Sequence, residues 1–323
     1  MYEVGIIGCG IISESHYKGF TRTGRARVTR VFDTDPEAAA GRAAEWGAEA
    51  APDAGALINS VDLVTIAAPG FAHRQYVEAA AAASKPVLCE KPVALNMADA
   101  LAMKKAVDDS GVPFLVAFSQ RYDRPLAQLR ALQREGRIGA TVSAWARLHS
   151  PASTERWRTI EESGHWRASM ELSGGRINEF SSHSINWLLW VLGRPLAVYG
   201  RALRVTEGFN LDDADYALIT CEGGVGLLDV QRHAGIAPEL NYGIQGHGGS
   251  VALKDEVVRL TLMDAEPVEV PITVEVTPKH EHFLDCVEGK ARPLNDIDDA
   301  IETLKVCLAF NRSAAGGRVE EVE

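Results

Sequence analysis

Three polar side chains that could carry catalytic chemistry lie within the otherwise apolar segment GGRINEFSSHSINWLLWVLG, residues 174–193. Glu179, His183 and Asn186 are separated by four and three residues, so a helix would place all three on one face. The unperturbed pKa of histidine suits it to accept an alcohol proton near neutral pH. Glu179 would orient the His183 ring or contact a second hydroxyl group, and Asn186 would offer a donor and an acceptor to a polyol. The same spacing is typical of the solvent-facing stripe of an amphipathic helix, so these residues alone leave both interpretations open.

Lys91 is a second candidate, because it stands between Glu90 and Pro92 at the end of the apolar run 85–92. A residue before proline is restricted to extended conformations, so the Lys91 side chain is aimed by its backbone. An ammonium group near an alcohol oxygen favours the alkoxide that develops as hydride leaves. A solvated surface lysine beside a glutamate is the alternative interpretation.

The elements that would position Lys91 alternate between apolar strands and helices. Strands are expected within 2–13, 26–33, 61–69, 85–92 and 112–118, with helices within 14–24, 36–46, 73–84 and 97–111. Unbroken apolar strands between helices predict a parallel sheet that is covered on both faces. A ligand should then bind beyond the carboxyl ends of the strands, where Pro69, Glu90 and Lys91 fall.

The first strand breaks into the turn Gly8-Cys9-Gly10-Ile11-Ile12-Ser13, a G-x-G-x-x-S pattern with Ser13 in place of the usual third Gly or Ala. Such a turn lets the backbone approach a pyrophosphate at the start of the next helix. Asp33 ends the second strand, 23 residues after Gly10, near the interval expected of the acid that binds the adenosine ribose. A carboxylate there repels a 2′-phosphate and predicts NAD rather than NADP. Asp35 is expected to cap the following helix.

The alternation of strands and helices ends near residue 120, and most later strands are expected to follow one another without intervening helices. Beyond a helix at 125–136 and a strand at 140–150, a polar helical region at 155–193 precedes the β-type runs. These runs cover 196–205, 214–233, 240–255, 257–263 and 267–276, and a final helix covers about 298–315. The fold class is therefore α/β, with a Rossmann parallel sheet over residues 1–120. An α+β domain with a large, mostly antiparallel sheet is expected over residues 121–323.

These segments together resemble the oxidoreductase family of glucose-fructose oxidoreductase and inositol dehydrogenase (Gfo/Idh/MocA). The resemblance rests on the glycine turn, on HYKGF (16–20), on the spacing of Pro69 and His73, and on CEKPVAL (89–95). It extends through residues 119–142 and 174–193 to 244–253 and 299–317, and so covers essentially the whole chain.

The resemblance implies that Lys91 and His183 are catalytic and that Glu179 supports them. It implies a cofactor-binding set of Gly8, Gly10, Ile12, Ser13, Asp33, Pro69, His73, Glu90, Arg121, Trp166 and Arg167, and a substrate-binding set of Lys91, Tyr122, Glu179, His183 and Asn186. Trp157-Arg158 is a weaker candidate than Trp166-Arg167. The family usually has Asp where this chain has Glu179 and Asn186, so its substrate specificity is expected to differ.

The resemblance also implies how the last helix packs and how copies of the chain associate. The last helix is expected to pack back on the first domain, and the open face of the second sheet is expected to form a homodimer or homotetramer interface.

Composition and charge exclude several classes of protein. The 323 residues carry a net charge of −11 and no conspicuous basic block, which argues against nucleic-acid binding. The five scattered cysteines form no C-x-x-C pair, which predicts a reducing, cytoplasmic location. No basic leader or membrane-length apolar run is present in the sequence, so no membrane association is expected. His280, Glu281 and His282 have no further ligands at a consistent spacing, so no metal is expected, and the start of a helix is the preferred interpretation.

The predicted function is NAD-dependent hydride transfer between nicotinamide and a secondary alcohol or ketone of a sugar, cyclitol or sugar derivative. One alternative is an NAD-retaining glycosidase that works by transient oxidation. The other is a non-catalytic NAD- or sugar-binding regulator, which ranks last because both Lys91 and His183 are present.

Overall fold

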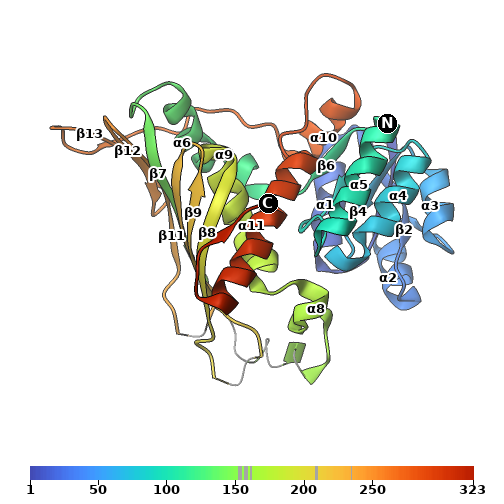
Figure 1. Cartoon of the computed structure of the whole chain (residues 1–323). Helices are drawn as coiled ribbons and strands as arrows, with labels where there is room; N and C mark the ends of the chain where they lie inside the picture. Colours follow the sequence, from blue (N-terminus) through green and yellow to red (C-terminus); the bar gives the residue numbers. More distant parts are fainter. Residues whose placement is uncertain (152–154, 156–158, 161, 208–209, 234) are drawn as a thin grey trace. The chain divides into compact units, whose positions relative to one another are not determined.

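The computed structural model describes residues 1–151, 155, 159–160, 162–207, 210–233 and 235–323 (Figure 1). The chain divides into two units, each with its own sheet. The first unit contains Met1–Phe118 and Thr277–Ile301, and the second contains Ser119–Val276 and Glu302–Glu323. The segment Thr277–Ile301 thus belongs with the amino-terminal part of the chain.

The first unit is built on a six-stranded sheet with the order β3-β2-β1-β4-β5-β6, in which all neighbouring strands pair in parallel. The strands are β1 (Tyr2–Ile7), β2 (Ala26–Phe32), β3 (Glu49–Ala50), β4 (Leu63–Ile66), β5 (Val87–Cys89) and β6 (Phe114–Val116). This is the strand order of a dinucleotide-binding Rossmann sheet. Strands β2 and β3 lie on one side of β1 and strands β4, β5 and β6 lie on the other, so the order reverses between β1 and β4. The predicted parallel Rossmann sheet is confirmed.

Helices in the first unit begin and end at residues suited to those positions. They are α1 (Ile11–Thr23), α2 (Pro36–Trp46), α3 (Ala54–Ser60), α4 (His73–Ala82), α5 (Met97–Ser110) and α10 (Lys279–Val287), with a short 3-10 turn, η1 (Gly70–Ala72). Asp35 caps α2 by accepting hydrogen bonds from the backbone N–H groups of Glu37 and Ala38, as predicted. Helices α1 and α2 both end at a glycine in the left-handed conformation.

A nine-stranded sheet forms the second unit, with the order β14-β13-β12-β11-β7-β10-β9-β8-β15. The strands are β7 (Thr141–His149), β8 (Pro195–Leu203), β9 (Ala214–Cys221), β10 (Gly224–Gln231), β11 (Glu239–Gly246), β12 (Gly249–Lys254), β13 (Val257–Leu262), β14 (Val268–Glu269) and β15 (Glu320–Glu321). Only the β7–β10 pair is parallel among the strand pairs described. The mostly antiparallel second sheet is therefore confirmed.

One predicted strand is wrong for most of its length. Within residues 267–276 only Val268–Glu269 pair as a strand. Pro271 lacks an N–H to donate, and the N–H groups of Thr273 and Val274 donate instead to the side-chain Oε1 of Gln128, at 2.9 and 3.1 Å. The Val270 N–H still donates to the Val258 carbonyl of β13 at 2.8 Å, but beyond Pro271 these backbone donors are satisfied by a side chain of α6 and not by a neighbouring strand.

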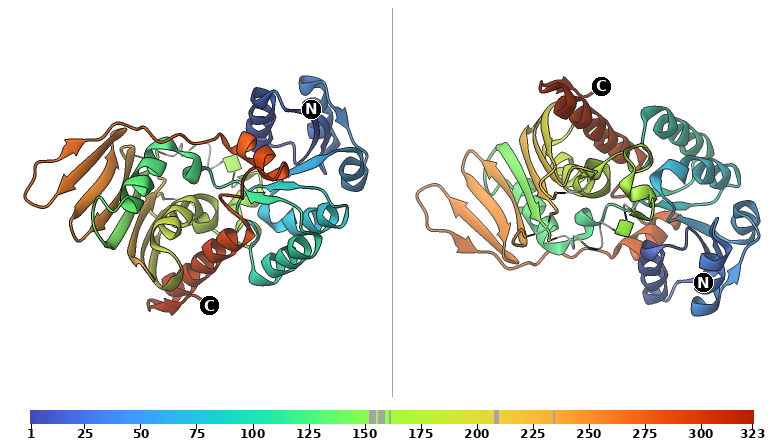
Figure 2. Two further views of the ribbon diagram at one scale, coloured as in Figure 1. Left: turned by 90° about the horizontal axis from the view of Figure 1, so that it is seen from above. Right: turned by 90° about the horizontal axis from the view of Figure 1, so that it is seen from below.

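The helices of the second unit are η2 (Ser119–Tyr122), α6 (Arg124–Arg134), η3 (Trp166–Ala168), α8 (Met170–Ser173), η4 (Ile177–Ser181), α9 (Ser182–Leu192) and α11 (Ile297–Gly316), whose first residues belong to the first unit. Helices α6, α9 and α11 lie against one side of the sheet (Figure 2). Trp187 and Leu188 of α9, together with Phe310 of α11, are fully buried in the hydrophobic core. No described helix is long and apolar enough to cross a membrane.

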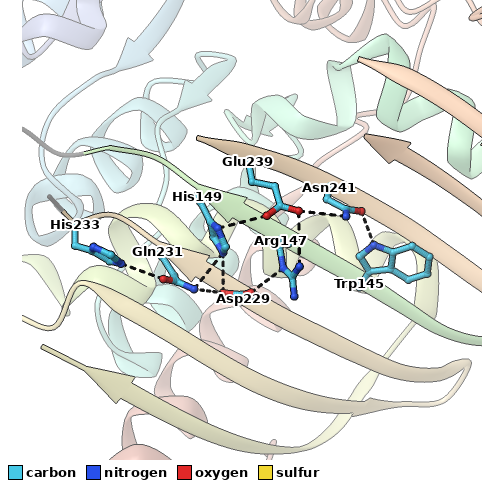
Figure 3. A network of polar contacts seen from close by, with 8 residues as sticks. All are labelled: Trp145, Arg147, His149, Asp229, Gln231, His233, Glu239 and Asn241. Carbon is cyan, nitrogen blue, oxygen red and sulfur yellow. Dashed lines mark hydrogen bonds and ion pairs between the residues drawn. The ribbon is translucent and has the colours of Figure 1, made fainter. Parts of the chain in front are cut away.

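A network of eight polar and aromatic side chains lies on the face of the sheet opposite this core (Figure 3). Its members come from β7, β10 and β11 and from the residues just after β10: Trp145, Arg147, His149, Asp229, Gln231, His233, Glu239 and Asn241. Asp229 accepts a hydrogen bond from Arg147 Nε at 2.8 Å, and its Oδ1 lies 3.1 Å from Nε2 of His149. Charges of both signs are therefore paired along the middle of this face.

Candidate active site

The glycine turn joins β1 to α1 in the first unit. Gly8 has a φ of +99°, and a Cβ there would lie 2.6 Å from the backbone of Ala67 and Ala68, so this position requires glycine. A Cβ at Gly10 would meet no atom within 4 Å, and among the described residues no side chain caps the adjoining end of α1. Open space before uncapped N–H groups is the arrangement that binds a pyrophosphate.

Two further residues of the turn complete this end of α1. The Ser13 hydroxyl donates to the Gly10 carbonyl at 2.5 Å, which closes the turn from within. Ile12 is partly exposed, at 38%, although it is a large apolar residue. An exposed apolar side chain beside an anion-binding turn suits contact with a cofactor that has both polar and apolar parts.

Asp33 is linked directly to the glycine turn. Its Oδ2 accepts a hydrogen bond from the Cys9 N–H at 2.7 Å, and its Oδ1 accepts one from the Asp35 N–H at 2.9 Å. Burial, together with the Asp33 charge, raises the pKa of the Cys9 thiol to about 12, so this cysteine stays protonated. The acid expected to bind a ribose and the turn expected to bind a pyrophosphate are thus held as one unit. We conclude that these residues fit a dinucleotide.

His73 lies inside the first unit rather than on its surface. Pro69 precedes η1, and His73 begins α4 with its ring fully buried. The ring Nε2 lies 2.8 Å from the Ala68 carbonyl and Nδ1 lies 3.2 Å from the Val93 carbonyl, while burial lowers the ring pKa. The neutral ring can donate to only one of these carbonyls. His73 therefore lies between the loop after β4 and the loop after β5, and its contact with a cofactor stays a prediction.

Glu90 and Lys91 follow β5, at the carboxyl edge of the parallel sheet. Glu90 is buried, and its Oε2 accepts a hydrogen bond from the Lys91 N–H at 3.1 Å. Its other oxygen, Oε1, lies 3.0 Å from Nε2 of His16 on α1. The backbone at Lys91 is thus held by the carboxylate that precedes it. The sequence interpretation assigned no role to His16, and its only sequence signal is its place in HYKGF.

The segment with Glu179, His183 and Asn186 is not one regular α-helix. Residues Ile177–Ser181 form a π-helical turn, and α9 begins only at Ser182. A π-turn is wider than an α-turn, so the angles expected from a regular helix do not hold across Glu179. A π-turn inside a helix is often found at functional sites.

These three side chains also differ in their surroundings. Glu179 is 8% exposed, and its Oε2 accepts a hydrogen bond from Arg167 Nε at 3.1 Å. His183 is half-buried, whereas Asn186 is completely buried. The three residues therefore do not form the polar stripe of a surface helix.

Asn186 and Arg121 contact each other in the interior of the second unit. The Asn186 side-chain amide donates to Thr303 Oγ1 on α11 at 3.2 Å, and its backbone carbonyl accepts a hydrogen bond from Arg121 at 3.4 Å. The Arg121 guanidinium is buried over the ring of Trp190, 5.7 Å from its centroid. The structure thus gives both residues internal contacts, and their contacts with ligands stay predictions.

The remaining predicted residues lie in short 3-10 turns of the second unit. Trp166 and Arg167 belong to η3, and the Arg167 guanidinium stacks on the Trp166 ring at 4.5 Å. Tyr122 ends η2 and is half-buried. Trp157-Arg158 lies outside the described residues. Arg167 therefore connects Trp166 to Glu179.

The His280 region contains a helix, as the sequence interpretation preferred. His280 lies in the first turn of α10, where its Nε2 is 3.0 Å from Nδ1 of His16. Among the residues that the structure describes, no cluster of three or more His, Cys, Asp or Glu side chains suits a metal ion.

Known families and proteins match both units. Residues 2–118 match the oxidoreductase family with an NAD-binding Rossmann fold, and residues 126–252 match the GFO/IDH/MocA C-terminal domain. Inositol 2-dehydrogenase 3 of Saccharopolyspora erythraea is 30% identical over 280 residues, which cover 84% of this chain and 78% of that protein. D-apiose dehydrogenase of Paraburkholderia graminis is 25% identical over 356 residues, covering 100% and 90%.

A solved structure has the same fold. It is the WlbA dehydrogenase of Bordetella pertussis in complex with NADH and UDP-GlcNAcA, with a TM-score of 0.87, 23% identity, and coverage of 99% of this chain and 98% of that one. Two matched domains in the expected order, a relative of 30% identity and a glycine turn that fits a dinucleotide agree with one another. The chain belongs to the Gfo/Idh/MocA family of NAD-binding oxidoreductases.

Proposed function

We propose that this protein oxidises a secondary alcohol of a sugar, cyclitol or sugar derivative, or reduces the corresponding ketone, with NAD as cofactor. The observation that carries the proposal is the buried Glu90 carboxylate that holds the backbone of Lys91 at the carboxyl edge of a sheet whose first turn fits a dinucleotide. Relatives named for dehydrogenation of inositol and of D-apiose support the substrate class. Bound NAD supplies the hydride acceptor.

Lys91 and His183 divide the proton and charge chemistry in this proposal. The Lys91 ammonium stabilises negative charge as it develops on the substrate oxygen, and the held backbone at Lys91 limits its reorganisation. His183 accepts the hydroxyl proton, for which a half-buried imidazole is suited. Glu179, paired with Arg167, orients the imidazole or accepts a hydrogen bond from a second hydroxyl group.

The ribose and pyrophosphate of NAD would be held by the glycine turn with Asp33, and Ile12 would contact an apolar part of the cofactor. Asp33 accounts for a preference for NAD, because its charge opposes a 2′-phosphate. Tyr122, Trp166, Arg121 and His73 remain candidates for contacts around the nicotinamide or the substrate.

A substrate screen tests the proposal. Formation of NADH is measured with cyclitols, aldoses, anhydrosugars and glycosides, and the best substrate is then used with His183→Ala and Lys91→Met. Each variant should lose about 10²- to 10⁴-fold in kcat while keeping its affinity for NADH. Undiminished kcat in His183→Ala would remove the base from the proposal. Release of a sugar from a glycoside without net NADH would favour redox-assisted cleavage instead.

We also propose that the protein forms a homodimer or homotetramer through the face of the nine-stranded sheet opposite its hydrophobic core. Exposed apolar residues from three strands, Tyr199, Leu218 and Leu227, accompany the paired charges of Figure 3 on this sheet. The molar mass of the wild type and of Leu218→Asp/Leu227→Asp, measured by light scattering, tests this proposal. A double variant with the mass of the wild-type oligomer would contradict it.

A reducing, cytoplasmic compartment fits the cysteines. All five are free and buried. Fractionation of the producing cells, followed by thiol counting on the purified protein, would test this assignment.

A further inference from the structure

Four charged or titratable side chains gather inside the first unit, where three elements far apart in sequence meet. Glu90 follows β5, His16 lies on α1, and Lys279 and His280 begin α10. His16 and His280 are separated by 264 residues in sequence, yet their ring nitrogens are 3.0 Å apart. His16, Glu90 and His280 are each less than a tenth exposed.

The chain is shaped to hold the two rings in this position. A Cβ at Gly19 of α1 would lie 2.1 Å from Nδ1 of His280, so no larger residue fits beneath that ring. Phe20 of α1 packs edge-on against His280, with ring centroids 4.8 Å apart. The close approach at Gly19 and the contact with Phe20 limit the positions open to the His280 ring, whose Nε2 faces His16.

The contacts of His280 with His16 and of His16 with Glu90 form an array, and the chemistry of the three groups decides which atom donates at each contact. Burial lowers the pKa of both imidazoles, that of His280 to about 2, so both rings are neutral. An ionised Glu90 only accepts, so His16 must donate from Nε2, and its Nδ1 is then an acceptor. His280 must therefore donate from Nε2 to His16. Both N–H groups point along the array toward Glu90.

The Glu90 carboxylate stays charged because of this arrangement. Burial alone raises the pKa of Glu90, but the His16 hydrogen bond, together with the nearby Lys279 and Lys91 side chains, outweighs burial and holds the pKa well below its usual range. The titratable and charged groups that face this carboxylate are His16, His73, Cys89, Lys91, Lys279 and His280. Each carboxylate oxygen of Glu90 has a different partner: Oε1 accepts from His16, and Oε2 accepts from the Lys91 N–H.

We propose that His16 and His280 are positioning residues for the reaction, which hold Lys91 in its active geometry through the Glu90 carboxylate. Neither imidazole contacts the reacting atoms in this proposal, and neither transfers a proton to substrate. The inference rests on the role of Lys91 in the proposed function. It adds two residues of α1 and α10 to the determinants of turnover.

A matched pair of variants at His16 tests the inference. His16→Gln keeps an N–H donor for Glu90, whereas His16→Leu has similar bulk and none. We expect His16→Leu to lower kcat about 10- to 100-fold, as a displaced catalytic group does, and His16→Gln to recover most of that loss. In His16→Leu the Glu90 carboxylate becomes protonated more easily, so kcat should also fall on the acid side through an ionisation that wild type lacks. NADH affinity and KM should change little, and His282→Leu on the same helix is the control.

Three results distinguish failure of the positioning role from failure of the proposed function. If Lys91→Met is inactive but His16→Leu keeps wild-type kcat and pH profile, the positioning role is wrong while the proposed function stands. If Lys91→Met is fully active, the proposed function itself fails. If His16→Leu does not fold, Glu90→Gln takes its place and should lower kcat without the added acid-side ionisation; wild-type kcat in Glu90→Gln would overturn the inference.

A readout without turnover uses the wild-type protein labelled with ¹⁵N-histidine. The nitrogen chemical shifts should report His16 and His280 as neutral rings that both carry their proton on Nε2. A proton on Nδ1 of either ring would overturn the inference, because the array would then no longer donate toward Glu90.

Discussion

The Nε atom of Arg167 lies 3.1 Å from Oε2 of Glu179, so the carboxylate of the π-turn reaches a cation held on a separate 3-10 turn. The resemblance described above implies Asp at this position in the family, and an Asp side chain is one methylene shorter. A shorter side chain at position 179 would not reach Arg167 without movement of either turn. We therefore expect the exchange of Glu179 for Asp to lower activity.

We accordingly expect Glu179→Asp to lower kcat/KM about 10-fold or more, because the shorter side chain leaves a buried carboxylate without its cation. Steady-state kinetics with the best substrate provide the measurement. Glu222→Asp is the control, since Glu222 pairs with Arg194 at 2.7 Å on the surface. Equal kcat/KM for Glu179→Asp and wild type would show that the Arg167 contact has no part in turnover.

Two variants of Asp33 separate its charge from its hydrogen bond to Cys9. Asp33→Asn removes the charge but keeps an oxygen that accepts from the Cys9 N–H, so NADP should bind at least about 10-fold more tightly than to wild type. Asp33→Ala removes both, so binding of both cofactors should weaken as the glycine turn loosens. Titration of NADH and NADPH fluorescence measures these affinities. Tighter binding of NADP than of NAD by the wild type would contradict the assigned preference.

Asn186 is buried with its amide donating to Thr303, so an acid at this position is costly. Asn186→Asp should lower the free energy of unfolding by roughly 1 to 3 kcal/mol, because the new carboxylate is desolvated and the amide donor is lost. Urea unfolding measures this change, and Asn59→Asp on the exposed side of α3 is the control. A large change in KM without a loss of stability would instead indicate that Asn186 contacts the substrate.

The sequence was sufficient to predict those features that depend on neighbouring residues. The spacing of nearby residues predicts the glycine turn and the Asp35 cap. The apolar runs between helices predict that the strands of the first sheet are parallel. The two-residue strand β3 and helix α3 were missed, since β3 is too short to give a periodic signal. The segment after Pro271 is wrongly predicted as a strand, because its backbone N–H groups donate to the side chain of Gln128 and not to a neighbouring strand.

Contacts between distant residues could not be predicted in the same way. The contact of His16 with His280 depends on where α10 packs, and that packing is set by Gly19 and Phe20 rather than by any motif at His280. The π-turn at Glu179 likewise depends on its surroundings. Ser181, its last residue, donates a hydrogen bond to the buried Asp215 of β9 at 2.6 Å.

That carboxyl group predicts how stability depends on pH. Burial raises the pKa of Asp215 from 3.8 to about 7, with Asp212 and Asp213 adding to the rise while Ser181 and Arg176 oppose it. The folded state thus binds a proton at Asp215 that the unfolded state releases near pH 4. The protonated carboxyl contributes stability below about pH 4, and this contribution is lost as the pH rises toward 7.

Asp215→Asn removes the titration while keeping an oxygen that accepts from Ser181. Relative to this variant, the wild type should lose roughly 2 to 4 kcal/mol of unfolding free energy between pH 4 and pH 7. Urea unfolding of both proteins across this range measures the difference, with Asp264→Asn at an exposed turn as the control. Parallel stability curves for wild type and Asp215→Asn would mean that Asp215 is ionised in the folded protein throughout. In that case Arg176 and Ser181 together compensate its burial, and the π-turn with Glu179 is held by a charged rather than a neutral group.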